Sequence, residues 1–107
     1  MTNLINMTPH PIFIVDAEGN KLQTILPSGN TIRLTQRTER VTAINGIPIS
    51  NTVYRDALGL PHFQEETYYI VSQLIKTALP QRTDLLVPAE MLRDANGNII
   101  GCQSLGQ

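Results

Sequence analysis

The chain has 107 residues, 41% of them hydrophobic and 16% charged, and its basic and acidic side chains leave a net charge of -1 at pH 7. This length fits one domain with a single core, and the near-neutral charge offers no basic surface of the kind that binds nucleic acid or anionic membranes. Cys102 is the only cysteine, so no intrachain disulfide can form, and no apolar run is long enough for a membrane-spanning helix. The first seven residues lack the basic and apolar stretches of a signal peptide. We therefore expect residues 1–107 to form a single cytoplasmic domain.

The N-terminal third predicts a β-hairpin. Ile12–Val15 is a compact run of β-branched and aromatic residues, and Lys21–Leu26 alternates as its partner strand would. The turn between them, Asp16–Asn20, contains a glycine that can adopt a positive φ at little cost. Almost the same pentapeptide recurs as Asp94–Asn98, which predicts a second hairpin near the C-terminus.

A longer hairpin is predicted in the middle of the chain. Thr31–Val41 alternates over an unusual length, with one face polar throughout. Asn45-Gly46 is typical of a type I′ turn, which joins residues 40–44 to residues 47–50. Pro48 has no backbone N–H to donate, so the second arm of this hairpin is expected to be an edge strand, through which copies of the chain can pair.

Residues 57–66 are then expected to form a loop that leads into a β-α-β unit spanning about 68–88. Tyr69–Val71 is the first strand of this unit, Ser72–Leu79 is a short helix, and residues 85–87 are the second strand. The roughly twelve residues between the two strands suit a parallel crossover.

The fold class is therefore predicted to be α+β, a hairpin-rich mixed sheet with one parallel β-α-β unit and one or two short helices. The second helix is one turn over residues 88–92. Three turn glycines are predicted to have positive φ angles: Gly19, Gly46 and Gly97. The predicted core consists of Ile12, Ile14, Val41, Ile70, Leu74, Ala78, Leu86 and Ile100.

The start of the predicted helix is the first candidate binding site. Free backbone N–H groups at a helix N-terminus attract anions, and the cations Lys76 and Arg82 lie close by in the sequence. Ser72 occupies the N-cap position, and a simpler interpretation is that it only caps the helix. Thr8 and His10 are a second candidate, because two prolines hold the histidine in a stiff loop. Their simpler interpretation is a rigid entrance to the first strand with local hydrogen bonds.

Metal and catalytic motifs are not found. The potential soft ligands, His10, His62 and Cys102, have no zinc-like spacing, so we expect no metal and no cofactor. No nucleophile-elbow glycines surround the serines, and Cys102 is expected to be a buried thiol in a terminal strand. The sequence thus argues against an enzyme without excluding one.

Five segments of the chain look familiar when taken together: residues 6–12, 45–48, 69–72, 82–88 and 93–102. They resemble a family of small proteins from bacteria and their phages that begin with Asn-Leu-Thr-Pro-His. The resemblance covers almost the whole chain, with Met7 where leucine is more usual, and it implies an origin rather than an activity.

These observations favour a small non-catalytic phage or prophage accessory protein that acts in the host cytoplasm. It would bind a host factor or a small anionic ligand, such as a nucleotide in counter-defence, through Thr8, His10, Ser72, Arg82 and Asp84. One alternative is a virion decoration or assembly protein, which the near-zero charge and the predicted edge strand favour. Another is a small hydrolase that uses His10. Neither nucleic acid nor a membrane is an expected partner.

Overall fold

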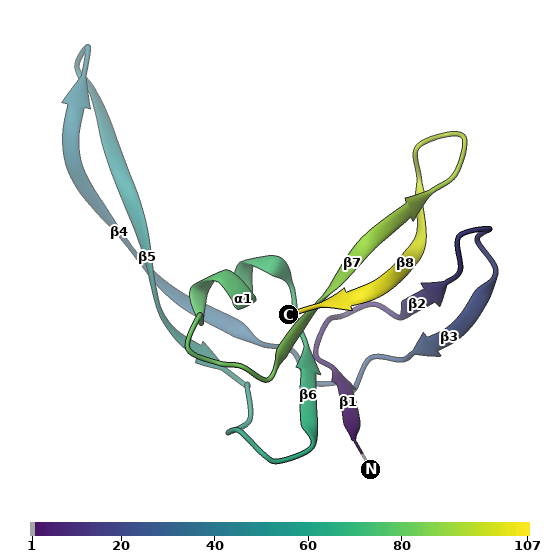
Figure 1. Ribbon diagram of the computed structural model, residues 1–107. Coiled ribbons are helices and arrows are strands. Elements are labelled where there is room, and N and C mark those ends of the chain that lie inside the picture. Colours follow the sequence, from purple (N-terminus) through teal and green to yellow (C-terminus); the bar gives the residue numbers. More distant parts are fainter. Residues whose placement is uncertain (1) are drawn as a thin grey trace.

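A computed structural model describes residues 2–107, apart from the side chain of Arg55. Within this range the chain forms an α+β fold with mixed strand directions and one short helix, as predicted (Figure 1). The elements are β1 (Asn3–Asn6), β2 (Ile12–Val15), β3 (Lys21–Ile25), β4 (Arg33–Ile44), β5 (Ile47–Leu58), β6 (Thr67–Ile70), α1 (Gln73–Ala78), β7 (Leu85–Arg93) and β8 (Ile99–Gly106).

Six of the strands form one sheet in the order β1-β6-β7-β8-β2-β3. The β6-α1-β7 segment is the predicted parallel unit, because Tyr69 pairs with Leu85 and Ile70 with Leu86 in parallel register. β1 lies parallel to β6 on its other side, whereas β7–β8 and β2–β3 are the two predicted antiparallel hairpins. The hairpins meet at a single parallel contact between β8 and β2.

The sheet curls until its two edge strands meet at one end. Asn6, at the end of β1, bridges to Pro27 just after β3, and its carbonyl oxygen accepts the backbone N–H of Ser28 at 2.9 Å. Away from this contact β1 and β3 diverge and flank a depression of about 630 Å³. We call this gap between residues 2–5 and residues 23–26 the seam.

The curled sheet separates two hydrophobic clusters, because successive side chains of a strand point to opposite faces. On the outer face, α1 covers a cluster made of Met7, Tyr69, Val71, Ile75, Leu85 and Val87. The inner face holds a smaller cluster made of Ile12, Ile70 and Cys102. β6 contributes a buried side chain to each cluster, so it links the two.

The core prediction is confirmed at two positions, met in part at four and wrong at two. Val41 is 54% exposed because it lies on a hairpin that leaves the body of the protein, and Leu74 is 52% exposed because α1 buries Ile75 in its place. Ile12 and Ile70 are buried as predicted. Four further members of the predicted set are partly buried: Ile14, Ala78, Leu86 and Ile100.

Two further expectations differ from the structure. Residues 88–92 form no helical turn but belong to β7, because β8 pairs with Pro88, Ala89, Met91 and Leu92. The loop expected over residues 57–66 begins later, since β5 continues to Leu58. The helix itself is confirmed, with Ser72 as its N-cap.

The turn glycines behave as predicted. Gly19, Gly46 and Gly97 have φ angles of 87°, 76° and 84°. Gly101 has a different role, because a Cβ there would lie only 2.8 Å from the carbonyl oxygen of Phe13. A side chain at this position would push β8 away from β2 and break the contact between the two hairpins.

Candidate functional site

The most distinctive feature of the molecule is the hairpin of β4 and β5, which we call the arm (residues 33–58). Its two strands have twelve residues each and pair only with one another in the described part of the chain. Figure 1 shows the arm extending away from the curled sheet. This length reflects the local sequence, in which β-favouring alternation flanks an Asn-Gly turn and two β-bulges add twist.

The base of the arm is anchored to the body. Ile32 and Leu34 pack against the outer hydrophobic cluster. The hydroxyl of Thr35 accepts the backbone N–H of Asp56 at 2.9 Å and so ties the strands together there. Gly59, which follows β5, has a φ of 92°, and a Cβ there would lie 2.6 Å from the carbonyl oxygen of Thr31. The arm therefore leaves the body at a fixed point.

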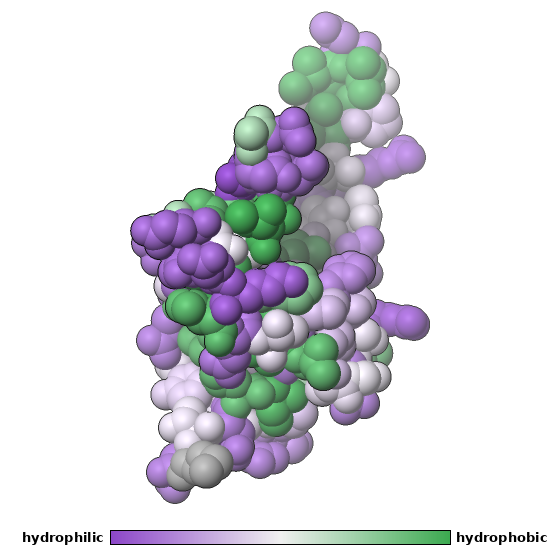
Figure 2. Space-filling view, turned by 90° about the vertical axis from the view of Figure 1, so that its right-hand side faces the viewer, coloured by the Kyte–Doolittle hydropathy of each residue, from purple (hydrophilic) through white to green (hydrophobic). Residues whose placement is uncertain are grey.

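The tip of the arm, in contrast, is apolar and exposed. Ile44 and Ile47 lie opposite one another beside the turn and are 59% and 64% exposed, and Val41 is exposed as well. Figure 2 shows hydrophobic atoms gathered at the upper end of the molecule, where Figure 1 places the arm. Large apolar side chains concentrated on a projecting element are typical of an interaction site.

The arm makes the molecule much more extended than its length requires. The radius of gyration is 17.1 Å, against about 13 Å for a compact domain of this size. The accessible surface is 7449 Å², about 1,500 Å² more than the roughly 6,000 Å² expected for a folded monomer of 11.9 kDa. This excess is similar to the total area buried in a standard protein interface, about 1,600 Å².

Charge is also divided between the arm and the rest of the chain. The arm contains four arginines and two acidic residues, a net charge of +2, whereas the remaining residues have four basic and seven acidic side chains, a net charge of −3. Within the arm, residues 41–54 carry no charge. Arg37, which contacts Glu39, and Arg40 lie between this uncharged segment and the base. The arm is thus an apolar tip followed by a basic segment.

The structure brings Ser72 and Thr8, two of the predicted site residues, to one small depression of about 240 Å³. The hydroxyl of Ser72 accepts the backbone N–H of Ile75 at 3.4 Å, which is the capping role of the simpler interpretation. Since α1 has only six residues, its dipole offers little attraction to an anion.

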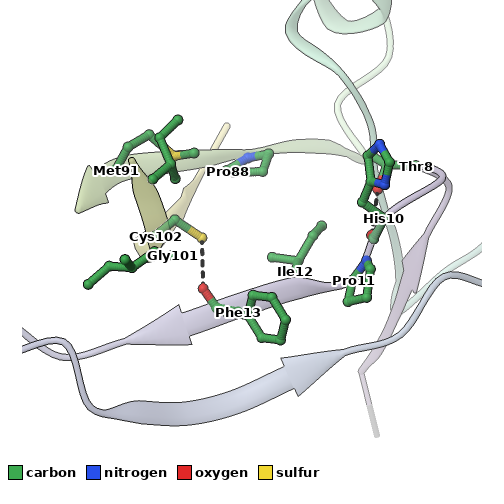
Figure 3. A pocket seen from close by; sticks show the side chains of 11 residues that line it. Thr8, His10, Pro11, Ile12, Phe13, Pro88, Met91, Gly101 and Cys102 are labelled. Atoms are coloured by element: carbon green, nitrogen blue, oxygen red, sulfur yellow. Dashed lines mark hydrogen bonds between the residues drawn. The ribbon is translucent and has the colours of Figure 1, made fainter. Parts of the chain in front are cut away.

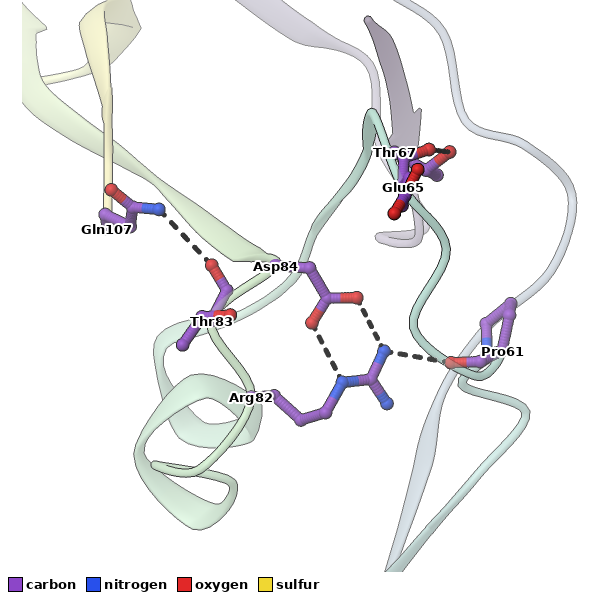
Figure 4. A network of polar contacts seen from close by, with 7 residues as sticks. All are labelled: Pro61, Glu65, Thr67, Arg82, Thr83, Asp84 and Gln107. Carbon is purple, nitrogen blue, oxygen red and sulfur yellow. Dashed lines mark hydrogen bonds and ion pairs between the residues drawn. The ribbon is translucent and has the colours of Figure 1, made fainter.

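Arg82 and Asp84 lie elsewhere: Asp84 lines a depression with Thr67 at the start of β6, whereas Ser72 follows the end of that strand. Figure 4 shows the contacts of the pair. The guanidinium of Arg82 donates two hydrogen bonds to the Asp84 carboxylate, at 2.8 and 2.7 Å, and one to the carbonyl oxygen of Pro61 at 2.9 Å. The hydrogen bonds from Arg82 hold the pKa of Asp84 below its ordinary value, and the same pair raises the pKa of Arg82. The expected juxtaposition of Arg82 with the helix start is therefore wrong.

Asn6 explains the Thr8-Pro-His10-Pro motif, although no local pattern in the sequence points to this residue. Its buried amide donates to the carbonyl oxygens of His10 at 2.8 Å and Ile25 at 3.1 Å. Its side-chain oxygen accepts both the backbone N–H and the hydroxyl of Thr8. Asn6 thus joins β1, the following loop and β3, which agrees with the local hydrogen bonds expected for Thr8 and His10.

His10 lines an apolar cleft of about 470 Å³ that lies between β2, β7 and β8 (Figure 3). Cys102 lies in its wall, 1% exposed, with its thiol 3.7 Å from the carbonyl oxygen of Phe13. Burial raises the pKa of this thiol, so it remains protonated at neutral pH and is a poor nucleophile. Among the described residues no group of three potential metal ligands gathers here or elsewhere.

No family model, curated protein or solved structure matches the chain. In the described residues, no helix is long and apolar enough to cross a membrane.

Proposed function

We propose that the protein is a structural assembly subunit and that the arm makes the contact between copies. The observation that carries this proposal is the exposed apolar tip on a rigidly anchored hairpin. This role is one of those expected from the sequence, and the resemblance to phage proteins is consistent with a subunit of a particle.

Leaving the apolar side chains of the arm in water has a free-energy cost. An isolated two-stranded hairpin is marginally stable, since it has no third strand or helix to cover its apolar side chains. Ile44 and Ile47 are exposed, and their burial under another surface would lower the free energy of the system. Covering them with a partner would also remove the excess accessible surface.

The other expected roles receive less support from the geometry. An anion or nucleotide site would need a free cation near the start of α1, but Arg82 is paired with Asp84 at the other end of β6. A hydrolase would need an activated nucleophile near His10, but the nearby Cys102 thiol is buried with a raised pKa. The arm needs no such group, because backbone pairing and apolar contact are enough.

The test is to measure association with and without an intact tip. We expect sedimentation velocity to show that the mass of the wild-type protein rises above that of the 11.9 kDa chain with increasing concentration. Val41→Asp and Ile47→Asp should each raise the dissociation constant at least tenfold. Leu74→Asp is the matched control, because Leu74 is about as exposed as Val41 but lies on α1.

The outcome that contradicts the proposal is a wild-type protein that stays monomeric up to about millimolar concentration. The arm would then serve a different macromolecule, as the expected host-factor role implies. Circular dichroism of each variant should match that of the wild type, because the substituted side chains do not contribute to either hydrophobic cluster.

A further inference from the structure

We propose that the arm of one copy docks in the seam between β1 and β3 of the next copy, an inference that rests on the proposed assembly function. The arm and the seam match in three independent ways: in open strand edges, in exposed apolar side chains and in charge.

The first match is in the strand edges. β1 and β3 are the two ends of the six-stranded sheet, so each has one edge without a neighbouring strand. Within the described residues they are joined at Asn6, which meets Pro27 and Ser28 through its backbone and Ile25 through its side chain, and they diverge from that point. An open edge of this kind accepts an extended strand from another molecule. The seam offers two such edges facing a common gap.

The arm has one suitable edge to offer. Ile44 and Ile47 flank the two-residue turn and form its hydrogen-bonded pair, so the next pair, Ala43 and Pro48, directs its backbone groups outward. Pro48 has no N–H, which weakens the outer edge of β5 as a partner. We therefore assign β4 as the strand that pairs with the seam.

The second match is in apolar surface. Leu4 and Leu26 line the two sides of the seam and are 41% and 69% exposed. Such side chains suit the uncharged distal part of the arm, where Ile44 and Ile47 project. Burying apolar side chains on both partners stabilises the contact by roughly 25 cal/mol for each Å² removed from water.

The third match is in charge. The acidic excess of the body includes Glu18, in the turn before β3, and Glu65, in the loop whose end hydrogen-bonds to the start of β1. With the uncharged tip inside the seam, the basic segment of the arm with Arg37 and Arg40 would lie nearer these acidic residues. Opposite charges at the rim of an interface speed association and fix its register.

This contact uses different surfaces on the two partners. Each copy gives one arm and accepts one, so the assembly is a closed ring or an open filament rather than a two-fold dimer. Such an assembly also accounts for the excess accessible surface of the chain. Each chain would bury one surface at its arm and one at its seam, and each surface is about 800 Å² in a standard interface.

The test combines one variant in the arm with one in the seam. Ile47→Asp removes the donor surface but keeps the seam, and Leu26→Asp removes the acceptor surface but keeps the arm. We expect each alone to sediment as a monomer and the mixture to form a one-to-one dimer and nothing larger. Ile99→Asp, in the apolar cleft, is the matched control and should assemble as the wild type does.

The possible failures are distinguishable. If Leu26→Asp assembles normally while Ile47→Asp does not, the arm binds another surface, and the seam assignment is overturned while the assembly function stands. Loss of assembly in Ile99→Asp alone would make the cleft the acceptor. A mixture that stays monomeric also overturns the seam assignment. A monomeric wild-type protein overturns the assembly function itself.

A cross-link tests the same contact without a destabilising charge. Copies with Ile47→Cys mixed with copies with Thr24→Cys should form a disulfide-linked heterodimer when oxidised with copper phenanthroline. Cys102 is buried and adds no background. Replacing Thr24→Cys by Ile99→Cys should abolish the heterodimer, and equal yields from the two pairs would contradict docking in the seam.

Discussion

The β4–β5 and β7–β8 hairpins begin from the same local chemistry and end in different surroundings. Each is a long antiparallel pair closed by an Asn-Gly turn whose glycine has a positive φ. β7 has Leu85 and Val87 buried and lies between β6 and β8, whereas both strands of the arm are exposed over most of their length. The turn sequence is therefore enough to form a hairpin. Buried apolar residues at the base of the hairpin determine whether it joins a larger sheet.

This difference separates stability from function. The β7–β8 hairpin supports the fold, because its first residues belong to the outer hydrophobic cluster. The arm contributes to that cluster only at its base, and its distal residues are available to a partner. Substitutions of the same type should therefore have unequal effects in the two hairpins.

The largest contrast is expected between two leucines. Leu85→Ala should lower the free energy of unfolding by roughly 2–5 kcal/mol, because Leu85 is fully buried and its removal leaves a cavity. Leu58→Ala, at the end of β5, should cost less than about 1 kcal/mol, since Leu58 is 55% exposed. Urea unfolding of dilute protein measures both, and equal losses would mean that the arm is part of the cooperative core.

Asn6→Ala should have the next largest effect, about 2–3 kcal/mol. The substitution leaves the carbonyl oxygens of His10 and Ile25 without their donor and frees the Thr8 loop. Thermal unfolding measures the loss, and Asn3→Ala, at the exposed start of the same strand, is the control. A loss below about 0.5 kcal/mol would show that the sheet does not depend on this closure.

The Arg82–Asp84 pair should contribute somewhat less and should depend on pH. The pKa of Asp84 is lower in the folded protein than in the unfolded chain, so its stabilising effect is present above about pH 4 and is lost as the pH falls through the folded pKa. Arg82→Ala should cost about 1–3 kcal/mol at pH 7, because it leaves the buried Asp84 carboxylate without its cation.

Acid unfolding checks the sign of this pH dependence. Asp84→Asn removes the titrating group, so its stability should fall less between pH 5 and pH 2 than that of the wild type. Arg93→Ala is a suitable control for Arg82→Ala, because Arg93 is exposed and binds only a turn carbonyl. Parallel pH profiles for Asp84→Asn and the wild type would contradict the assigned role.

The sequence predicted the elements well because their signals are local. The three glycine turns, the N-cap at Ser72 and the parallel crossover each depend on a few neighbouring residues, and all are confirmed. Val41 was misassigned to the core because alternation in a strand does not reveal whether another layer covers it. Intrinsic β-propensity predicts that a segment forms a strand, but it does not predict which surface packs against that strand.

The candidate site was less predictable because it depends on distant residues. The placement of Arg82 was inferred from its closeness in sequence to the helix, but a parallel crossover returns the chain to the opposite end of the first strand. The seam forms only because the sheet curls and brings β1 close to β3. This curl depends on hydrogen bonds that Asn6 donates to residues up to nineteen positions away. Neither feature has a local signature.

The smallest expected effects compare the two turns directly. Gly97→Ala and Gly46→Ala both place a side chain at a φ above 70°, where alanine is strained by about 1 kcal/mol. In each case a Cβ would meet nothing within 4 Å, so the strain is the only local cost. We expect Gly97→Ala to lower the global midpoint of unfolding, because β7 and β8 belong to the main sheet.

Gly46→Ala should instead leave that midpoint unchanged in dilute protein, because the distal arm can open while the body remains folded. Its effect should appear in hydrogen exchange, as faster exchange of the amides that pair residues 42–44 with residues 47–49. At concentrations where the protein assembles, the same substitution should weaken association, since the tip must be ordered to dock. Equal shifts of the global midpoint for the two variants would show that the arm and the β7–β8 hairpin unfold as one unit.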